Sequence, residues 1–295
     1  MSISKELKPY SLLVSLFFVY ACTQNPVGDD EISSRNRTIK GEVRLSNNLH
    51  SENVYVWLDG FNLGTRTDEQ GKFRLALPPT SAQDNFAGVT GAFNLYFFVA
   101  NFNLQSTQVF IQNGLFVYSE GEINSSGELN QPKFLIQNLQ IQTKVQPSSV
   151  SNSEIVVVEG KSNFILRVDV TLQTVKDSIV VFYPALVKDT FGPLLYRNVD
   201  SNEVTILGST VATFVDSDLD TVDMVPGKRT MVVPLFPDDL LPGEYEIIPY
   251  LLIKNEEIPE RLIGSLGEDV EELGPDYLSI PMIREGNERF FKVFQ

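Results

Sequence analysis

The sequence predicts an all-β protein with two β-sandwich domains in tandem behind an N-terminal export signal. Three observations support this prediction. Apolar and polar residues alternate with period two in many short segments, Gly, Pro and Asn mark turns between them, and a single uncharged apolar run lies near the N-terminus. The 295 residues suffice for two domains, and a composition of 42% apolar and 21% charged residues excludes a disordered chain.

The first element is the uncharged apolar run at residues 10–21, which follows a segment with Lys5 and Lys8. As a helix, this run would cover about 18 Å at roughly 1.5 Å per residue. That length is too short for a hydrocarbon core of about 30 Å but typical of the apolar region of a signal peptide. The run ends at Ala21-Cys22, and Cys22 is the only cysteine of the chain.

Together, the basic start, the apolar run and Val19-Tyr20-Ala21-Cys22 resemble a bacterial lipoprotein signal. The resemblance implies that residues 1–21 are removed and that Cys22 is lipidated, with palmitate-like acyl chains holding the protein at the outer membrane of the cell envelope. The alternative is an ordinary secretory signal followed by a tolerated thiol. Residues 22–37 are polar and contain Pro and Gly, which predicts a flexible tether.

The first domain is predicted over residues 38–146. Its opening strands are indicated by three alternating sets of apolar residues, namely Gly41, Val43 and Leu45; Val54, Val56 and Leu58; and Phe73, Leu75 and Leu77. A hairpin turn at Asp68–Gly71 precedes the third set. Asp68 can accept hydrogen bonds from backbone N–H groups a few residues on, and Gly71 adopts a positive φ without a steric cost.

This part of the chain resembles the carboxypeptidase regulatory-like domain, a transthyretin-like Greek-key sandwich of seven strands. The matching residues are Gly41 and Val43, then Asn53, Val54, Val56, Leu58 and Gly60, and then Thr65 through Pro78. The resemblance implies a fold and no activity, because the domain is a non-catalytic module. A zinc peptidase would need His-x-x-Glu and a further His, whereas His50 is the only histidine of the chain.

The rest of the first domain is predicted from composition. Segments rich in aromatic and β-branched residues indicate strands at 93–102, 107–112, 115–120 and 133–145. Asn113-Gly114 between two of them is typical of a tight hairpin.

The second domain is predicted over residues 147–295, because Gln146-Pro147 interrupts the strand pattern and marks a domain boundary. Strands are expected at 164–172, 179–183, 194–196, 204–207, 211–215, 230–235, 244–253 and 277–283. Leu241 through Tyr245 resembles the turn into a late strand of immunoglobulin-like sandwiches. Residues 255–276 are predicted to be a long loop with a helical turn or two.

Charge and motifs narrow the function classes. There are 38 acidic and 23 basic residues, and the net charge of −15 repels phosphates, which argues against a nucleic-acid partner. One His and one Cys exclude disulfide frameworks and His/Cys zinc sites, and no nucleophile elbow or phosphate-binding loop is present. We therefore expect a protein that is not an enzyme. Hydrolysis by a pair of carboxylates stays open as a further function class, because the distance between two carboxylates cannot be deduced from sequence.

The sharpest polar cluster is acidic. Asp216, Asp218 and Asp220 alternate in a short segment, a spacing that can direct oxygen ligands at one Ca²⁺ ion. The alternative is a solvated acidic loop. No other cofactor is predicted.

The sequence thus favours a non-catalytic, lipid-anchored cell-envelope protein that acts as an interaction or assembly module. Its partners would be the membrane, through the N-terminal lipid, and an envelope protein or a glycan. The alternative is a carbohydrate- or nutrient-binding surface lipoprotein that works with an outer-membrane transporter, with Phe61, Phe86 or Phe191 stacking on the ligand.

Overall fold

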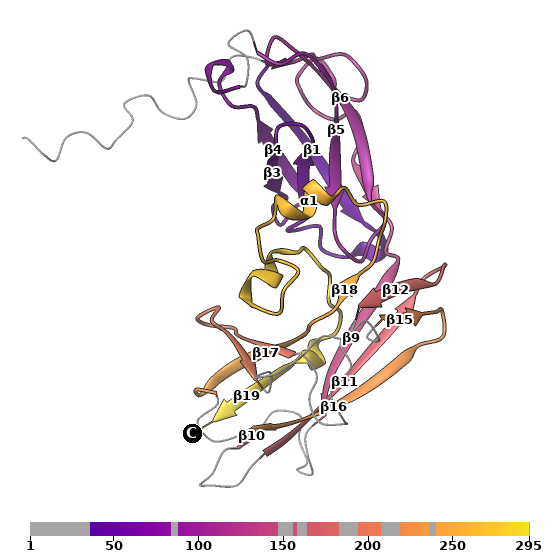
Figure 1. The fold of residues 1–295 in the computed structure, drawn as a ribbon, viewed down its shortest axis with the longest axis vertical. Helices are drawn as coiled ribbons and strands as arrows, with labels where there is room; N and C mark the ends of the chain where they lie inside the picture. Colours follow the sequence, from indigo (N-terminus) through magenta and orange to yellow (C-terminus); the bar gives the residue numbers. More distant parts are fainter. Residues whose placement is uncertain are drawn as a thin grey trace, which may run out of the picture.

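The computed structural model has two lobes stacked along the long axis of the molecule (Figure 1). It describes residues 36–83, 88–146, 156–157, 164–182, 194–207, 219–235 and 240–294. Their regular structure is almost entirely β-strand, which confirms the predicted all-β class. One short α-helix, α1 (Glu260–Gly264), and several 3₁₀ turns complete the described part of the chain.

The first lobe contains two sheets. The smaller has the order β4-β1-β8, in which β1 pairs antiparallel with β4 and parallel with β8. The larger has the order β3-β2-β5-β6-β7 and is antiparallel throughout. The strands of this lobe are β1 (Thr38–Leu45), β2 (Tyr55–Leu58), β3 (Leu63–Arg66), β4 (Lys72–Ala76), β5 (Gly91–Phe98), β6 (Gln105–Gln112), β7 (Leu115–Phe116) and β8 (Lys133–Leu135).

These two sheets enclose the core of the first lobe. Val43 and Phe73 from one sheet and Val56 and Phe97 from the other belong to one buried cluster. The rings of Phe73 and Phe97 meet edge to face with centroids 5.8 Å apart. The alternating residues of the sequence therefore form the inner faces of a β-sandwich.

Tight turns connect the strands of this lobe. The Asp68 carboxylate accepts hydrogen bonds from the N–H groups of Gln70 and Lys72, both at 2.9 Å, and Gly71 has a φ of +74°. A Cβ at Gly71 would lie 2.3 Å from the carbonyl oxygen of Val43, so only glycine fits there. Asn113 and Gly114 both have positive φ between β6 and β7, which is the geometry of the predicted hairpin.

The second lobe contains three sheets, with the orders β16-β11-β9, β10-β19-β17-β13-β14 and β15-β12-β18. Its strands are β9 (Leu139–Gln146), β10 (Val156–Val157), β11 (Phe164–Thr174), β12 (Ile179–Phe182), β13 (Leu194–Asn198), β14 (Val204–Leu207), β15 (Leu219–Val222), β16 (Gly227–Leu235), β17 (Gly243–Pro249), β18 (Leu252–Ile253) and β19 (Phe290–Phe294).

The core of the second lobe again lies between sheets. Val168 and Val170 of β11 face Tyr196 of β13, Ile247 of β17 and Phe291 of β19 in one buried cluster. From Leu166 to Leu172, every second residue of β11 points into this cluster, as the period-two pattern predicts.

The expected strand at 133–145 is two strands that belong to different lobes. β8 pairs with β1 of the first lobe, whereas β9 pairs with β11 of the second over eight residues. Between them the backbone bonds to a loop of the first lobe, since Asn103 N–H donates to Ile136 and Asn138 N–H donates to Asn101. The chain therefore enters the second lobe before Gln146-Pro147, and sequence alternation carries no sign of this change of sheet.

The expected strand at 277–283 is wrong. A 3₁₀ turn, η4 (Pro275–Ser279), stands at its start, and no strand is assigned at 277–283. Tyr277 is fully buried, and its hydroxyl donates to the carbonyl oxygen of Leu251 at 2.8 Å. Pro275 favours the first turn of a helix, and apolar Tyr277 and Ile280 lie three residues apart, which suits a 3₁₀ turn better than a strand. The expected helical turn within 255–276 is present as α1.

A third buried cluster joins the lobes. Trp57 on β2 and Phe98 at the end of β5 pack with Tyr250, Leu262 and Tyr277 from the second half of the chain. The segment from β18 to η4 carries α1 and runs between the lobes, where it covers the outer face of the β3-β2-β5 sheet (Figure 1). The lobes are therefore packed against each other, because they share an apolar core.

Asn101 provides the polar counterpart of this apolar contact. Its side chain is fully buried and donates to the carbonyl oxygens of Leu139 and Ile283, both at 2.9 Å. It also accepts from the N–H of Ile283 at 3.0 Å. One amide thus satisfies three backbone groups, from the start of β9 and from the C-terminal segment.

We predict that Asn101→Ala lowers the free energy of unfolding by about 3 kcal/mol, because it leaves these three buried groups without partners. Denaturant unfolding measures the change. The matched control is Asn94→Ala on the exposed side of β5, for which we expect less than about 0.5 kcal/mol. An equal loss in the two variants would contradict a special role for Asn101.

A second buried polar group, Asp169, lies on β11. Lys228 Nζ is 2.6 Å from its carboxylate, Thr230 Oγ1 donates at 2.6 Å, and the Gln146 amide donates as well. Burial raises the pKa of Asp169, but the hydrogen bonds from Lys228, Thr230 and Gln146 outweigh burial and hold the pKa below its ordinary value of 3.8.

Because this pKa is lowered by folding, ionised Asp169 stabilises the fold above about pH 5 and loses that effect as the pH falls through the folded pKa, below 3.8. We predict that the stability difference between the wild type and Asp169→Asn is constant from pH 5 to 7 and shrinks below pH 3.8. Denaturant unfolding across pH measures it. The control is the exposed Asp177→Asn, and a difference that is independent of pH would refute the prediction.

Candidate functional site

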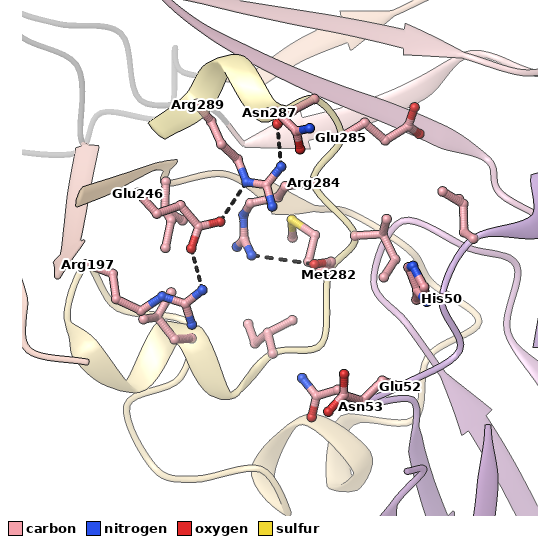
Figure 2. A pocket seen from close by; sticks show the side chains of 16 residues that line it. His50, Glu52, Asn53, Arg197, Glu246, Met282, Arg284, Glu285, Asn287 and Arg289 are labelled. Atoms are coloured by element: carbon pink, nitrogen blue, oxygen red, sulfur yellow. Dashed lines mark hydrogen bonds and ion pairs between the residues drawn. The ribbon is translucent and has the colours of Figure 1, made fainter. Parts of the chain in front are cut away.

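A cleft of about 660 Å³ lies where the two lobes meet. Its wall in the first lobe is the loop after β1 with His50, Glu52 and Asn53, and its wall in the second lobe comes from β13, β17 and the segment after η4 (Figure 2). The volume falls in the range of small-molecule sites. The lining of the cleft combines charged and apolar side chains. The apolar ones are Leu49, Ile248, Leu278, Ile280, Met282 and Ile283.

A buried carboxylate organises the charges of the cleft. Glu246 lies on β17 and is 4% exposed. Arg289 Nε is 2.8 Å from its Oε1, and Arg197 of β13 pairs with its Oε2, as the dashed lines in Figure 2 show. Both carboxylate oxygens are therefore engaged, and Glu246 acts as an anchor for two guanidinium groups.

Arg284 is the third guanidinium of the cleft, and it differs from the other two. Its Nε and Nη2 are buried and have no hydrogen-bond partner. Its Nη1 is 3.5 Å from the carbonyl oxygen of Met282, and its guanidinium lies 5.7 Å from the ring centroid of Tyr277. Buried guanidinium donors without acceptors are unusual, because the loss of their hydration is not offset by hydrogen bonds.

Polar contacts hold the first-lobe side of the cleft. Gln137 Nε2 donates to the Glu285 carboxylate at 2.6 Å, and Asn47 Nδ2 donates to Gln137 Oε1 at 3.2 Å. The N–H of Glu285 donates to the carbonyl oxygen of Ile141 at the start of β9. The segment that carries Arg284 is therefore bonded to both lobes.

This arrangement is suited to binding. One of its guanidinium groups, that of Arg284, has unused donors beside an apolar lining, while its carboxylates at positions 246 and 285 already accept hydrogen bonds. His50 lies on the exposed loop at the cleft margin.

The residues singled out from the sequence lie elsewhere. Cys22, Asp216 and Asp218 are outside the described residues. Asp220 lies on β15, where its carboxylate pairs with Arg229 at 2.6 Å. In the described ranges, no three His, Cys, Asp or Glu side chains are placed to hold a metal ion. The calcium site stays a prediction, and Asp68 and Gly71 belong to the turn described above.

The aromatic residues proposed to stack on a ligand are not assembled in the described part of the molecule. Phe61 packs on Phe93 with ring centroids 5.2 Å apart, at the margin of the first-lobe core. Phe86 and Phe191 are outside the described residues.

Sequence reasoning missed the arginine cluster of the cleft. Arg197, Glu246, Arg284 and Arg289 come from separate elements, and no local motif links them. Only the crowding of Arg284 and Arg289 into six residues of an acidic chain offers a signal, and such a signal is too weak to define a site.

Comparisons with known proteins leave the family open. No family model matches the chain, and no curated protein matches it. Among solved structures, a shaft pilin SpaA from Lactobacillus rhamnosus GG is 9% identical with a TM-score of 0.25, over 72% of this chain and 87% of that one. BcpA, the major pilin subunit of Bacillus cereus, is 12% identical with a TM-score of 0.22, over 72% of this chain and 63% of that one.

The Bacillus anthracis TIE protein is 8% identical with a TM-score of 0.22, and the match spans 75% of this chain but only 29% of that protein. At TM-scores of this size, none of these structures supplies a function for the chain. Within the described residues, no helix is long and apolar enough to cross a membrane.

We predict that Glu246→Gln lowers the free energy of unfolding by about 2 kcal/mol, because it leaves Arg197 and Arg289 without their shared anion. Arg197 is partly exposed, so solvent weakens its pair with Glu246 and reduces the loss of free energy of unfolding. Denaturant unfolding measures the change. In the matched control Glu42→Gln, the exposed pair with Arg44 is lost, and we expect less than about 1 kcal/mol. Equal effects would contradict the anchoring role of Glu246.

Proposed function

We propose that the chain is a non-catalytic, lipid-anchored protein of the cell envelope that acts as an interaction or assembly module. The anchor is the lipid on Cys22, and residues 22–37 tether two joined β-sandwiches to the membrane surface. The shared core between the lobes supports this proposal, because it makes the pair a single extended body that can present a surface at a set distance from its tether.

The observation that carries the proposal is an exposed apolar patch on the second lobe. It comprises five large apolar residues, each at least 36% exposed, at the end of β11, on β12 and β15 and just after β15, namely Val175, Val180, Leu219, Met224 and Val225. Thr174 N–H donates to the carbonyl oxygen of Asp223 and the Gln173 side-chain amide donates to that of Met224, which links the end of β11 to the segment after β15, and β12 pairs with β15. Exposed apolar residues gathered in this way are typical of protein interaction surfaces.

The test is capture of partners from the native envelope with the anchored protein, followed by mass spectrometry. We expect one envelope protein to be captured by the wild type and lost in the double variant Met224→Ser/Val225→Ser. Both side chains are more than half exposed, so the fold tolerates the change. The matched control is Leu241→Ser, which removes an equally exposed apolar side chain outside the patch.

Cys22→Ala tests the anchor separately. We predict that this variant leaves the membrane fraction and appears in the soluble fraction, because one lipid group carries all of the membrane affinity. Immunoblotting of the fractions measures it. Retention of Cys22→Ala in the membrane would contradict lipidation at this residue, and capture of no partner by the anchored wild type would contradict the assembly role.

The cleft favours a second candidate function, the capture of a small carbohydrate or nutrient for an outer-membrane transporter. Its volume of about 660 Å³ accommodates a ligand of disaccharide size, and its lining combines apolar and hydrogen-bonding groups. Binding of glycans to the purified protein, abolished by substitutions in the cleft, would favour this function over assembly.

A further inference from the structure

The hydrogen-bonding capacity of Arg284 is largely unused. A guanidinium has five N–H donors, and the three on Nε and Nη2 have neither a protein partner nor contact with solvent. The contact from Nη1 to Met282 is at 3.5 Å, the outer limit for a hydrogen bond. The Nε and Nη2 edge of the side chain is thus desolvated, and the guanidinium contacts the carbonyl oxygen of Met282 and the face of Tyr277.

The neighbouring carboxylates are already engaged. Glu246 accepts from Arg197 and Arg289, and Glu285 accepts from Gln137. The free edge of Arg284, formed by Nε and Nη2, is the edge to which a carboxylate binds through two parallel hydrogen bonds. An acceptor that meets this edge gains two charge-assisted hydrogen bonds without a new desolvation cost for the arginine.

We propose that the cleft binds a small ligand that bears a carboxylate, with the carboxylate on Arg284 and the body of the ligand against Ile248 and Ile280. In this proposal the terminal torsions of Arg284 rotate, its contacts with Met282 and Tyr277 are given up, and the free edge turns from the wall into the cleft. The proposal names the ligand class for the second candidate function and rests on it.

Charge favours a carboxylate over a phosphate. The lining contains three arginines and three glutamates, Glu52 among them, within a chain of net charge −15. A dianion therefore meets more repulsion than a monoanion in this setting, and a planar pair of oxygens matches the guanidinium fork.

The test is the melting temperature of the protein in increasing sodium glucuronate, with sodium chloride added to keep the ionic strength constant. Glucose is the neutral probe of nearly the same shape, and inorganic phosphate is the competing anion. Arg284→Gln removes the fork, and Arg284→Lys keeps the charge without the fork. The matched control, Arg44→Gln, removes an exposed arginine outside the cleft.

We expect glucuronate to raise the melting temperature of the wild type and of Arg44→Gln along the same saturating curve, with no rise in glucose. The apparent affinity falls about tenfold or more in Arg284→Gln, in proportion to two charge-assisted hydrogen bonds, and less in Arg284→Lys. If Arg284→Gln does not fold, Arg284→Lys alone must weaken binding.

Four results would overturn the inference. The first three are no response of the wild type to glucuronate, an unchanged response in both Arg284 variants, and a response to phosphate at least as strong as that to glucuronate. An equal response to glucose would also overturn it while leaving the capture of neutral ligands intact. Failure of the inference is thereby distinguished from failure of the second candidate function.

Discussion

The architecture depends on strands that are buried on both faces. All four residues of β2 are buried, with Val56 and Leu58 in the first-lobe core and Tyr55 and Trp57 in the cluster between the lobes. The second lobe repeats this on β17, where Ile247 points into its own core and Ile248 into the shared one. The sheet that contains β2 and the sheet that contains β17 are thus each covered on both faces. If the lobes separated, each of these sheets would expose a row of large apolar side chains to water.

Double burial also explains which parts of the fold the sequence predicts. Alternation predicts a strand that buries one face, and it correctly identifies β1, β4 and β11 because their buried apolar side chains lie two or four residues apart. Alternation carries no information about the partner of a strand, so it does not predict that β8 and β9 belong to different sheets. The apolar run at 277–283 predicts a strand, but its apolar side chains serve the contact between the lobes, where Tyr277 is buried, and local sequence carries no sign of that contact.

The candidate site was harder to foresee, for an electrostatic reason. A run of aspartates such as Asp216, Asp218 and Asp220 can be recognised in the sequence, whereas arginines that come from separate elements cannot be linked without the fold. The glutamate that matters, Glu246, lies in the strand Gly243–Pro249, where a central charged residue would ordinarily argue against burial. Only the tertiary structure, which sets Arg289 and Arg197 beside it, makes that burial tolerable.

The cleft and the contact between the lobes are formed by the same segment of the chain. The segment from Tyr277 to Arg289 first fills the shared core, then bonds to Asn101 through Ile283, and then lines the cleft with Arg284 and Arg289. A ligand that draws Arg284 away from Tyr277 acts on a side chain of the shared core, and the same segment is tied to both lobes by backbone hydrogen bonds. The cleft and the packing of the lobes therefore depend on the same segment, so a substitution that loosens the shared core around Tyr277 also disturbs the position of Arg284.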